Sequence, residues 1–300
     1  MRLTTLAPAK VNLVLRVGPR RDDGYHEILS LVAPLDLADR VDVRIGRRAG
    51  EVTCAVPGQR DLDGPSNLAA RAALLFRRRF GVENAVAIRI AKRIPVTAGL
   101  GGGSSDAAAV LRVLAGAFRV ADPRALAEIA LEVGSDVPLF LGAGPAWARG
   151  RGERLTPAKV PPVHLVLLHP VDPALAIRAA DAYRWLDDDR GAIVPPLPRR
   201  AVGFSPSALG NDLEPPCLGR RPGLSALPRL LVGQGATKAI MSGSGPTWFG
   251  AFTGRSAAVR AAGAIEGKGV VPEVQVIVTR TVQTLPRVTP WRSPRSASSP

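Results

Sequence analysis

A glycine-rich stretch at residues 95–106, Pro-Val-Thr-Ala-Gly-Leu-Gly-Gly-Gly-Ser-Ser-Asp, runs directly into an alanine-rich segment that favours a helix. Glycine has no Cβ atom, so such a loop lets a ligand approach the backbone closely. The helix that follows presents unpaired N–H groups and the positive end of its dipole. The stretch therefore predicts an anion site, most often a phosphate site.

Two common phosphate-binding loops do not fit this stretch. A Walker A loop ends in Gly-Lys-Ser/Thr, whereas Ser104 and Ser105 follow Gly103 here. A Rossmann turn needs a third glycine where Ser104 stands, and it follows a buried parallel strand. Residues 85–94 instead alternate apolar and polar side chains, which favours a strand with one wet face in an antiparallel sheet. A flexible surface turn is the alternative, but the ordered run before a helix favours phosphate binding.

The composition places the chain among globular proteins. Its 300 residues suffice for one large or two ordinary domains, and 46% of them are hydrophobic. Cys54 and Cys217 lie far apart and lack metal-ligand spacing, so we expect two reduced thiols. The first residues lack the apolar stretch of a signal peptide, and no run is long enough to span a membrane. We therefore expect a cytoplasmic protein with no membrane partner.

The formal net charge of +15 raises two alternatives, a nucleic-acid partner or a polyanionic small substrate. The basic residues are mostly arginines spread along the chain, for example at 77–79 and 220–221. They are not interleaved with aromatic residues, as surfaces that bind single strands tend to be. We therefore expect no specific nucleic acid and a positive field that attracts anionic substrates.

Strand and helix patterns mix without a regular βαβ rhythm, which predicts two α+β domains. The expected strands are residues 1–18, 41–45, 51–56, 85–94, 163–168, 237–241, 247–252 and 273–278. The expected helices are residues 67–79, 105–118, a segment from 123, 174–186 and 255–266. Residues 51–56 are expected to pair with 41–45, and 28–37 fit either a strand or a helix. Residues 195–206 read as a proline-rich loop, and the tail after residue 285 as disordered.

Three separated segments resemble, in order and spacing, the three motifs of the GHMP small-molecule kinases: residues 7–13, 95–109 and 241–247. Two further segments, 21–27 and 134–138, resemble the 4-diphosphocytidyl-2-C-methyl-D-erythritol kinases of the non-mevalonate isoprenoid pathway. The resemblance covers residues 3 to 280, nearly the whole chain. Any one of these motifs alone is a weak signal, but all of them in register make chance an unconvincing explanation.

This resemblance implies the α+β, two-domain architecture of that family. Residues 1–156 would form an ATP-binding domain resembling ribosomal protein S5 domain 2, and 157–284 a ferredoxin-like domain, followed by a tail at 285–300. It also implies that ATP, with Mg²⁺, phosphorylates the 2-hydroxyl of a small substrate that carries a cytidine diphosphate, in a monomer or homodimer. A GHMP kinase of the homoserine or mevalonate type is the nearest alternative, and a nucleic-acid-binding protein a more distant one.

Lys10 and Asp136 are the expected catalytic residues. Lys10 stands in an otherwise apolar strand, where a lysine is out of place unless it is paired or functional. The resemblance implies that Asp136 accepts the proton of the substrate hydroxyl, while Lys10 keeps Asp136 ionised near the γ-phosphate. The alternatives are a helix-capping aspartate and a strand-edge lysine that points to water. Asn12 shares the face of Lys10 and is expected to hydrogen-bond the acceptor.

The resemblance assigns the glycine loop and two residues outside it to ATP. The expected nucleotide-binding residues are Pro95, Ala98, Gly99, Leu100, Gly101, Gly102, Gly103, Ser104, Ser105, Asn67 and Lys92. Asn67 would lie on the adenine side, and Lys92 would line the nucleotide groove. A serine hydroxyl of the loop is expected to assist Mg²⁺, with no metal ligand assigned directly. Asp106 is expected in the first helical turn, where it would stabilise the dipole.

Tyr25 and His26 resemble the cytidine-recognition pair of the family, because an aromatic face can stack on a base and an imidazole can hydrogen-bond its edge. The alternative is a core tyrosine followed by a surface histidine. The third motif contributes Gly243, Ser244 and Gly245, whose backbone is expected to approach a substrate phosphate or to support the glycine loop.

Two positions depart from the family pattern. Thr97 stands where a glycine is more usual, which stiffens the start of the loop. Relatives carry a hydroxyl residue near Arg178 or Ala179 that contacts the acceptor, and this chain has none there. Arg178 could replace that contact by meeting a phosphate directly.

Overall fold

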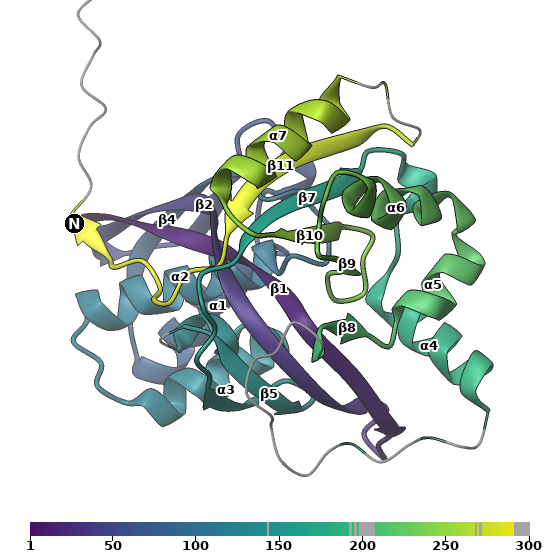
Figure 1. The fold of residues 1–300 in the computed structure, drawn as a ribbon. Helices are drawn as coiled ribbons and strands as arrows, with labels where there is room; N and C mark the ends of the chain where they lie inside the picture. Colours follow the sequence, from purple (N-terminus) through teal and green to yellow (C-terminus); the bar gives the residue numbers. More distant parts are fainter. Residues whose placement is uncertain are drawn as a thin grey trace, which may run out of the picture.

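A long antiparallel hairpin, β1 (Arg2–Arg20) and β2 (His26–Ala49), crosses the whole molecule (Figure 1). The computed structural model describes residues 1–142, 144–191, 194, 197, 208–267, 269 and 272–290. The apolar residues of 28–37 form strand rather than helix, and they continue without a break into the expected strand at 41–45. The turn between the two strands contains Gly24 at φ 83°, a conformation that favours glycine.

The hairpin is the centre of the first sheet, whose main order is β12-β1-β2-β4-β3. Short strands extend it, since β5 pairs with β2, β6 with β5, and β8 with β1. The remaining strands of this sheet are β3 (Val52–Ala55), β4 (Asn84–Ala91), β5 (Ala146–Gly150), β6 (Arg154–Pro157), β8 (Gly210–Asn211) and β12 (Thr289–Pro290).

Helices α1 (Leu68–Phe80) and α2 (Gly102–Ala117) pack on one face of this sheet, and α3 (Pro123–Val133) packs against both of them. Ala69, Ala70 and Ala73 of α1 are fully buried, as are Ala107 and Ala108 of α2. Such small side chains allow the helix backbones to approach closely. This packing fixes α2, and with it the glycine loop at its N-terminus, against the hairpin.

The second sheet has the order β11-β7-β10-β9. Its strands are β7 (His164–Pro170), β9 (Lys238–Met241), β10 (Trp248–Phe252) and β11 (Val274–Arg280), and its helices are α4 (Ala179–Arg190), α5 (Glu214–Arg220), α6 (Ala226–Gly233) and α7 (Arg255–Glu266). Strands β9 and β10, expected at 237–241 and 247–252, pair as an antiparallel hairpin. Phe249 and Leu167 join Val11 and Leu13 of β1 in one buried cluster, so the second sheet packs against the hairpin.

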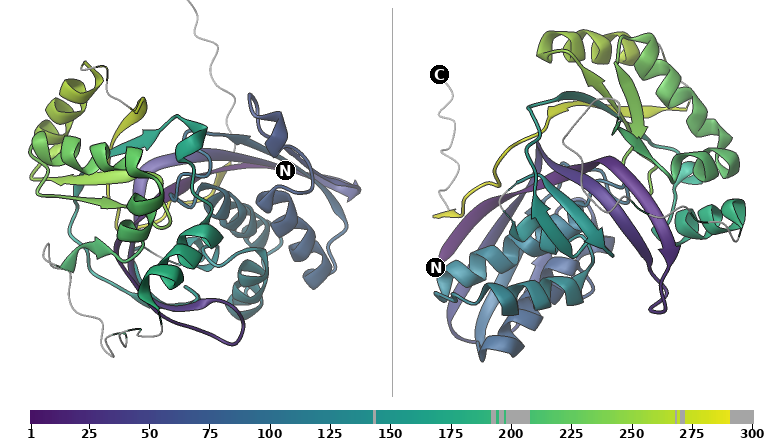
Figure 2. Two further views of the ribbon diagram at one scale, coloured as in Figure 1. Left: turned by 90° about the vertical axis from the view of Figure 1, so that its right-hand side faces the viewer. Right: turned by 60° about the horizontal axis from the view of Figure 1, so that its bottom comes forward.

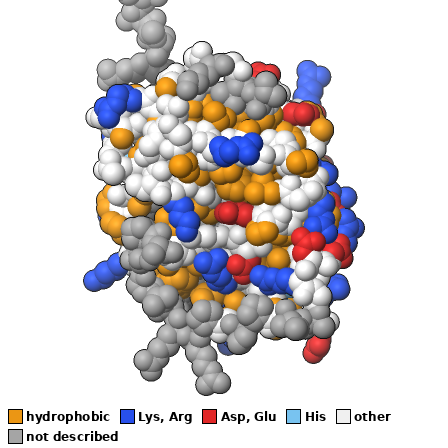
Figure 3. Space-filling view, turned by 45° about the vertical axis from the view of Figure 1, so that its right-hand side comes forward, with side chains coloured by type: hydrophobic (Ala, Val, Ile, Leu, Met, Phe, Trp, Pro, Cys, Tyr) orange, Lys and Arg blue, Asp and Glu red, His pale blue; other side chains and the backbone are white. Residues whose placement is uncertain are grey.

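The two sets of helices therefore lie on different sides of the long hairpin. Figure 2 shows the blue and teal helices α1 to α3 on one side and the green helices of the second sheet on the other. Within the described residues, no helix combines the length and apolar character that a bilayer span requires. On the face that Figure 3 presents, Lys and Arg side chains are scattered among acidic and apolar ones rather than gathered in one stripe.

The structure corrects several expected elements. Residues 52–55 pair in parallel with β4 rather than with 41–45, because β4 already occupies that edge of β2. Helix α2 begins three residues before Ser105, and α4 begins at Ala179 because Asp172 caps a separate short 3-10 turn, Pro173–Leu175. Residues 286–290 are not disordered, since Thr289 pairs with Thr4 in the first sheet. The proline-rich stretch at 195–206 lies almost wholly outside the described residues, as do 291–300.

Candidate active site

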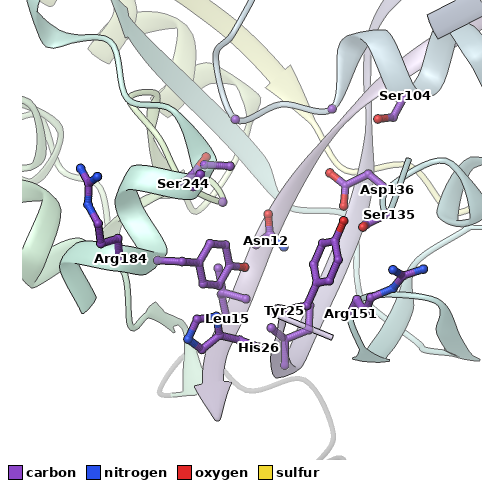
Figure 4. A pocket seen from close by; sticks show the side chains of 18 of the residues that line it. Asn12, Leu15, Tyr25, His26, Ser104, Ser135, Asp136, Arg151, Arg184 and Ser244 are labelled. Carbon is purple, nitrogen blue, oxygen red and sulfur yellow. The ribbon is translucent and has the colours of Figure 1, made fainter. Parts of the chain in front are cut away.

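A cavity of about 680 Å³ opens between the hairpin turn, the glycine loop, helix α4 and the turn between β9 and β10. Figure 4 shows Tyr25, Ser135 and Asp136 on one side of it, and His26, Arg184 and Ser244 on the other. The lining residues are Lys10, Asn12, Leu15, Arg20, Gly24, Tyr25, His26, Ile28, Gly99, Gly101, Ser104, Ser135, Asp136, Arg151, Ala179, Ala180, Tyr183, Arg184, Asp187, Gly243 and Ser244.

Lys10 is buried at the floor of this cavity, with 6% of its side chain exposed. Its Nζ donates to Asn12 Oδ1 at 2.7 Å and lies 3.5 Å from Asp136 Oδ2. Asn12 Nδ2 donates in turn to Ser30 Oγ at 2.8 Å, and that hydroxyl donates to the Val14 carbonyl at 2.7 Å. Because this chain of bonds is buried within the hairpin, it fixes the direction of the ammonium group.

Asp136 lies in the turn between α3 and a short 3-10 helix, Pro138–Leu141. Val137 and Phe140, both fully buried, anchor this turn. The Asp136 side chain is 48% exposed and faces the cavity, where it pairs with Lys10 instead of capping a helix. A carboxylate that is accessible to a ligand yet held by one ammonium group can accept a proton from a bound hydroxyl.

The glycine loop requires glycine at two points. Gly99 has φ 74°, and a Cβ atom there would lie 2.3 Å from the Ser242 carbonyl oxygen. Gly101 has φ 70°, caps α2, and a Cβ there would lie 3.1 Å from Cγ of Lys10. The loop is also tied to β1, because the Lys10 backbone N–H donates to the Leu100 carbonyl at 2.9 Å. The N-terminus of α2 is thus presented to the cavity beside Lys10, as an anion site needs.

The third motif lies against the glycine loop from the opposite side of the cavity. Ser242 Oγ donates to the Gly99 carbonyl at 3.0 Å. Gly243 has φ 56°, and a Cβ there would lie 3.2 Å from Lys10 Nζ. Gly243 and Ser244 line the cavity, while Gly245 closes the turn by donating its N–H to the Ser242 carbonyl. The motif therefore supports the glycine loop, one of its two expected roles.

Sequence reasoning missed Asn211, which holds this third turn. Its side chain is almost fully buried in β8, and Nδ2 donates to the carbonyls of Met241 at 2.8 Å and Gly243 at 2.7 Å. Its Oδ1 accepts from the Leu213 N–H at 2.9 Å. The nitrogen and the oxygen of the Asn211 amide are therefore both hydrogen-bonded. Because β8 pairs with β1, Asn211 holds the turn between β9 and β10 in place relative to β1.

The Asn211→Asp variant is expected to lose about 1–3 kcal/mol of stability and to lower kcat/KM, because a carboxylate cannot donate to two carbonyls. Denaturant unfolding and steady-state kinetics measure the two effects. Asn84→Asp is the matched control, since Asn84 Nδ2 donates to the Gly46 carbonyl far from the cavity. An Asn211→Asp enzyme whose kcat/KM matches that of the control would exclude Asn211 as a support of the site.

Tyr25 and His26 occupy different surroundings at the other end of the cavity. Tyr25 is 49% exposed, with the Arg151 guanidinium 4.7 Å from its ring centre, so it is not a core tyrosine. His26 is buried, stacks on Tyr183 at 5.2 Å between ring centres, and its Nε2 lies 2.8 Å from Asp187 Oδ1. The alternative of a surface histidine is therefore wrong.

Tyr183 and Asp187 were not expected in the site. Their spacing of four residues on α4 places both on one helix face. This spacing did not enter the prediction, because the helix predicted at 174–186 ends one residue before Asp187. Burial and the nearby Asp136 carboxylate raise the pKa of the Tyr183 phenol. This phenol therefore stays protonated.

Lys92 does not line the cavity. Its Nζ lies 2.5 Å from Asp39 Oδ2 and 2.9 Å from Asp106 Oδ2, and Asp39 Oδ1 accepts from the N–H groups of Arg93 and Ile94. Helix α2 begins at Gly102, so Asp106 lies beyond its first turn and pairs with Lys92 instead. The expected dipole role in the first turn is therefore wrong. The three side chains form a buried cluster that joins β2, the end of β4 and α2.

Three of the remaining expected nucleotide residues line the cavity, namely Gly99, Gly101 and Ser104. Asn67 caps α1, with Oδ1 accepting from the Ala69 N–H and Nδ2 donating to the Leu62 carbonyl. Ser104 lines the cavity, whereas Ser105 is fully buried. Among the described residues that do not line the cavity are Pro95, Ala98, Leu100, Gly102, Gly103 and Arg178.

The sequence was compared with family models and with known proteins. The family model described as GHMP kinases N terminal domain matches residues 67–144. A 4-diphosphocytidyl-2-C-methyl-D-erythritol kinase from Anaeromyxobacter sp. (strain Fw109-5) is 69% identical over 300 residues, covering 100% of this chain and 98% of the relative. One from Geobacter sp. (strain M21) is 42% identical, covering 88% and 95%.

Solved structures give the same result. A crystal structure of 4-(cytidine 5'-diphospho)-2C-methyl-D-erythritol kinase is 37% identical, with a TM-score of 0.76, and covers 93% of this chain and 99% of that one. A homoserine kinase from Cytophaga hutchinsonii, 18% identical with a TM-score of 0.65 and covering 96% and 97%, shares the fold alone. The fold and the glycine loop are those of a GHMP kinase. Within that class, the chain belongs to the 4-diphosphocytidyl-2-C-methyl-D-erythritol kinase family.

Proposed function

We propose that this chain transfers the γ-phosphoryl group of ATP to the 2-hydroxyl of 4-(cytidine 5'-diphospho)-2-C-methyl-D-erythritol, giving the 2-phosphate and ADP in the non-mevalonate isoprenoid pathway. The observation that carries this proposal is one cavity with a Lys10–Asp136 pair beside the glycine loop and the Tyr25–His26 pair at its other end. The identity to relatives of that name supports the same acceptor.

In this proposal Asp136 is the base. Its exposed carboxylate accepts the proton of the 2-hydroxyl as the bond from that oxygen to the γ-phosphorus forms. Lys10, whose Nζ lies 3.5 Å from Asp136 Oδ2, would offset the negative charge on the phosphoryl oxygens. Asn12, which is hydrogen-bonded to Ser30, orients Lys10 by accepting a hydrogen bond from its ammonium group. Phosphoryl transfer depends chiefly on such positioning and charge compensation.

The backbone of Gly99, Gly101 and Ser104 would bind the phosphates of ATP at the N-terminus of α2. The described residues contain no cluster of three His, Cys, Asp or Glu side chains that could hold a metal. Mg²⁺ bound to ATP keeps several waters and takes most other ligands from the phosphates, so a few oxygen donors of the protein suffice to hold it. The Ser104 hydroxyl and the Asp136 carboxylate are the oxygen donors that line the cavity beside the loop. When bound, Mg²⁺ would neutralise charge on the β- and γ-phosphates.

The finer architecture belongs to the same proposal. Residues 1–156 would be the domain resembling ribosomal protein S5 domain 2, and residues 157–284 the ferredoxin-like domain. The antiparallel order of the second sheet, β11-β7-β10-β9, with α4 after its first strand and α7 after its third, supports the second name. We further propose that the enzyme works in the cytoplasm as a monomer or homodimer, with no specific nucleic-acid or membrane partner.

A coupled ADP-release assay with ATP and Mg²⁺ tests the proposed reaction. We expect diphosphocytidyl-methylerythritol to stimulate ADP release, and mevalonate and homoserine to have no effect. Mass spectrometry should find the product heavier by one phosphoryl group, at the 2-position. Stimulation by mevalonate or homoserine alone would contradict the proposed acceptor.

The Tyr25→Ala variant is expected to raise the KM for the acceptor by about 10- to 100-fold, because a base stacked on an aromatic ring gains 1–3 kcal/mol. The KM for ATP should change little, since Tyr25 belongs to the turn between β1 and β2 and not to the glycine loop. Tyr25→Phe is the control, because it keeps the ring. An effect confined to the KM for ATP would be the contrary result.

A further inference from the structure

The hydrogen bond between His26 and Asp187 restricts what the histidine can offer to a ligand. Asp187 Oδ1 lies 2.8 Å from His26 Nε2, and the His26 ring stacks on Tyr183 with an interplanar angle of 21°. Only 7% of the His26 side chain is exposed, so the ring has little freedom to turn. Both partners come from the same face of α4, and all three side chains line the cavity.

An ionised carboxylate only accepts hydrogen bonds, so Asp187 requires the proton of the neutral imidazole to lie on Nε2. The other nitrogen, Nδ1, then carries a lone pair. In the part of the chain that the structure describes, no hydrogen-bond partner is recorded for Nδ1. In its neutral form the imidazole of His26, which lines the cavity, therefore carries one acceptor nitrogen and no second donor.

An acceptor at this point discriminates between pyrimidines. Position 4 of cytosine carries an amino group, which donates, whereas position 4 of uracil carries a carbonyl oxygen, which accepts. A lone pair on Nδ1 pairs with the amino group and faces the carbonyl with like polarity. A site that leaves a polar group unpaired rejects the wrong ligand more strongly than a matching contact favours the right one.

We propose that Asp187 is a specificity-determining residue, which holds His26 in the tautomer that selects a 4-amino pyrimidine over a 4-oxo pyrimidine. The proposal rests on the proposed function, because it assumes that the Tyr25–His26 end of the cavity receives the base. Asp187 acts through His26 and is a positioning residue, not a catalytic one. The same chemistry would apply to any acceptor whose base reaches His26.

The Asp187→Asn variant tests this proposal, because an amide can accept from or donate to Nε2 and so no longer dictates the tautomer. Calorimetry with cytidine 5'-diphosphate and uridine 5'-diphosphate, with the ATP site filled by excess ADP, gives the ratio of the two affinities. We expect the wild type to favour the cytidine ligand by about tenfold, the value of one hydrogen bond between neutral groups. Asp187→Asn should bring the ratio close to one.

Asp188→Asn is the matched control. Asp188 follows Asp187 on the same helix and pairs with Arg220 outside the cavity. Its substitution by asparagine removes the same charge as Asp187→Asn. The control should keep the wild-type ratio. Equal weakening of both ligands in Asp187→Asn would indicate a purely structural role and overturn the proposal, as would a wild-type enzyme that does not distinguish the two ligands.

Nitrogen NMR of labelled histidine provides a second readout, because the chain contains only three histidines. The His26 signals should report a proton on Nε2 in the wild type and in Asp188→Asn, and a mixture in Asp187→Asn. A wild-type proton on Nδ1 would overturn the proposal. Neither measurement needs turnover, so failure of the proposed reaction would appear separately, as absent ADP release with intact discrimination between the two diphosphates.

Discussion

The Asp136→Asn enzyme is expected to lose about 10²- to 10⁴-fold in kcat, the usual contribution of a general base. An amide of the same shape cannot take the proton of the acceptor hydroxyl, and it no longer compensates the buried Lys10 ammonium 3.5 Å away. Binding of ATP should be retained, because the glycine loop is tied to β1 through backbone hydrogen bonds that the substitution does not touch.

Single-turnover kinetics separates the chemical step from product release, and calorimetry with ADP measures nucleotide binding. Glu132→Gln is the control: Glu132 lies near the end of α3, carries the same charge, and pairs with Arg78 on the surface. Its kcat should equal that of the wild type. Unchanged turnover in Asp136→Asn would remove Asp136 from the role of base.

The Lys92→Met variant is expected to lose about 3–5 kcal/mol of stability, the usual cost of removing one partner from a buried ion pair. Lys92 is the cation between Asp39 and Asp106, whose side chains are 0% and 4% exposed. Without it, two carboxylates face each other in the core, beneath the start of α2. Urea unfolding measures the loss. The double variant Lys92→Met/Asp106→Asn should recover part of it, and no recovery would show that the carboxylates do not repel.

The same cluster predicts a pH dependence. Burial is the largest cause that raises the pKa of Asp106, from 3.8 to about 7. A carboxyl whose folded pKa is raised stabilises the fold fully below its unfolded pKa and loses that contribution as pH rises through the folded value. The Lys92→Met variant should therefore be least destabilised near pH 5 and most destabilised above pH 7. Unfolding curves at pH 5 and pH 8 give the comparison.

The sequence predicted most of what depends on local pattern. The glycine loop before α2 and the two strands that form the hairpin of β9 and β10 are confirmed, because each follows from turn or alternation rules within a few residues. Lys10 was singled out because a lysine in an apolar strand needs a partner. Its pairing with Asp136 came from the family resemblance, and the structure brings the two together.

What the sequence did not predict depends on contacts between distant residues. Asp39 lies within β2 and meets Lys92 only because β4 pairs alongside, so no local spacing links the two. Asn211 lies in the two-residue strand β8, and Asp187 lies near the end of α4. The positions of both elements depend on the packing of the second sheet. Residues 286–290 carry two prolines, and they are held in place because Arg112 of α2 donates to the Pro286 carbonyl and Thr289 pairs with Thr4.

The hairpin of β1 and β2 carries Lys10 near its middle and Tyr25 and His26 at its tip, and the two strands pair along their length with register shifts at three points. The distance between Lys10 and the Tyr25–His26 pair is therefore set by the length of a paired strand and not by a flexible loop. The cavity therefore selects its acceptor by the length of the molecule as well as by its base. An analogue with one phosphate fewer would fill the base end and leave its hydroxyl short of Asp136, so it would act as an inhibitor.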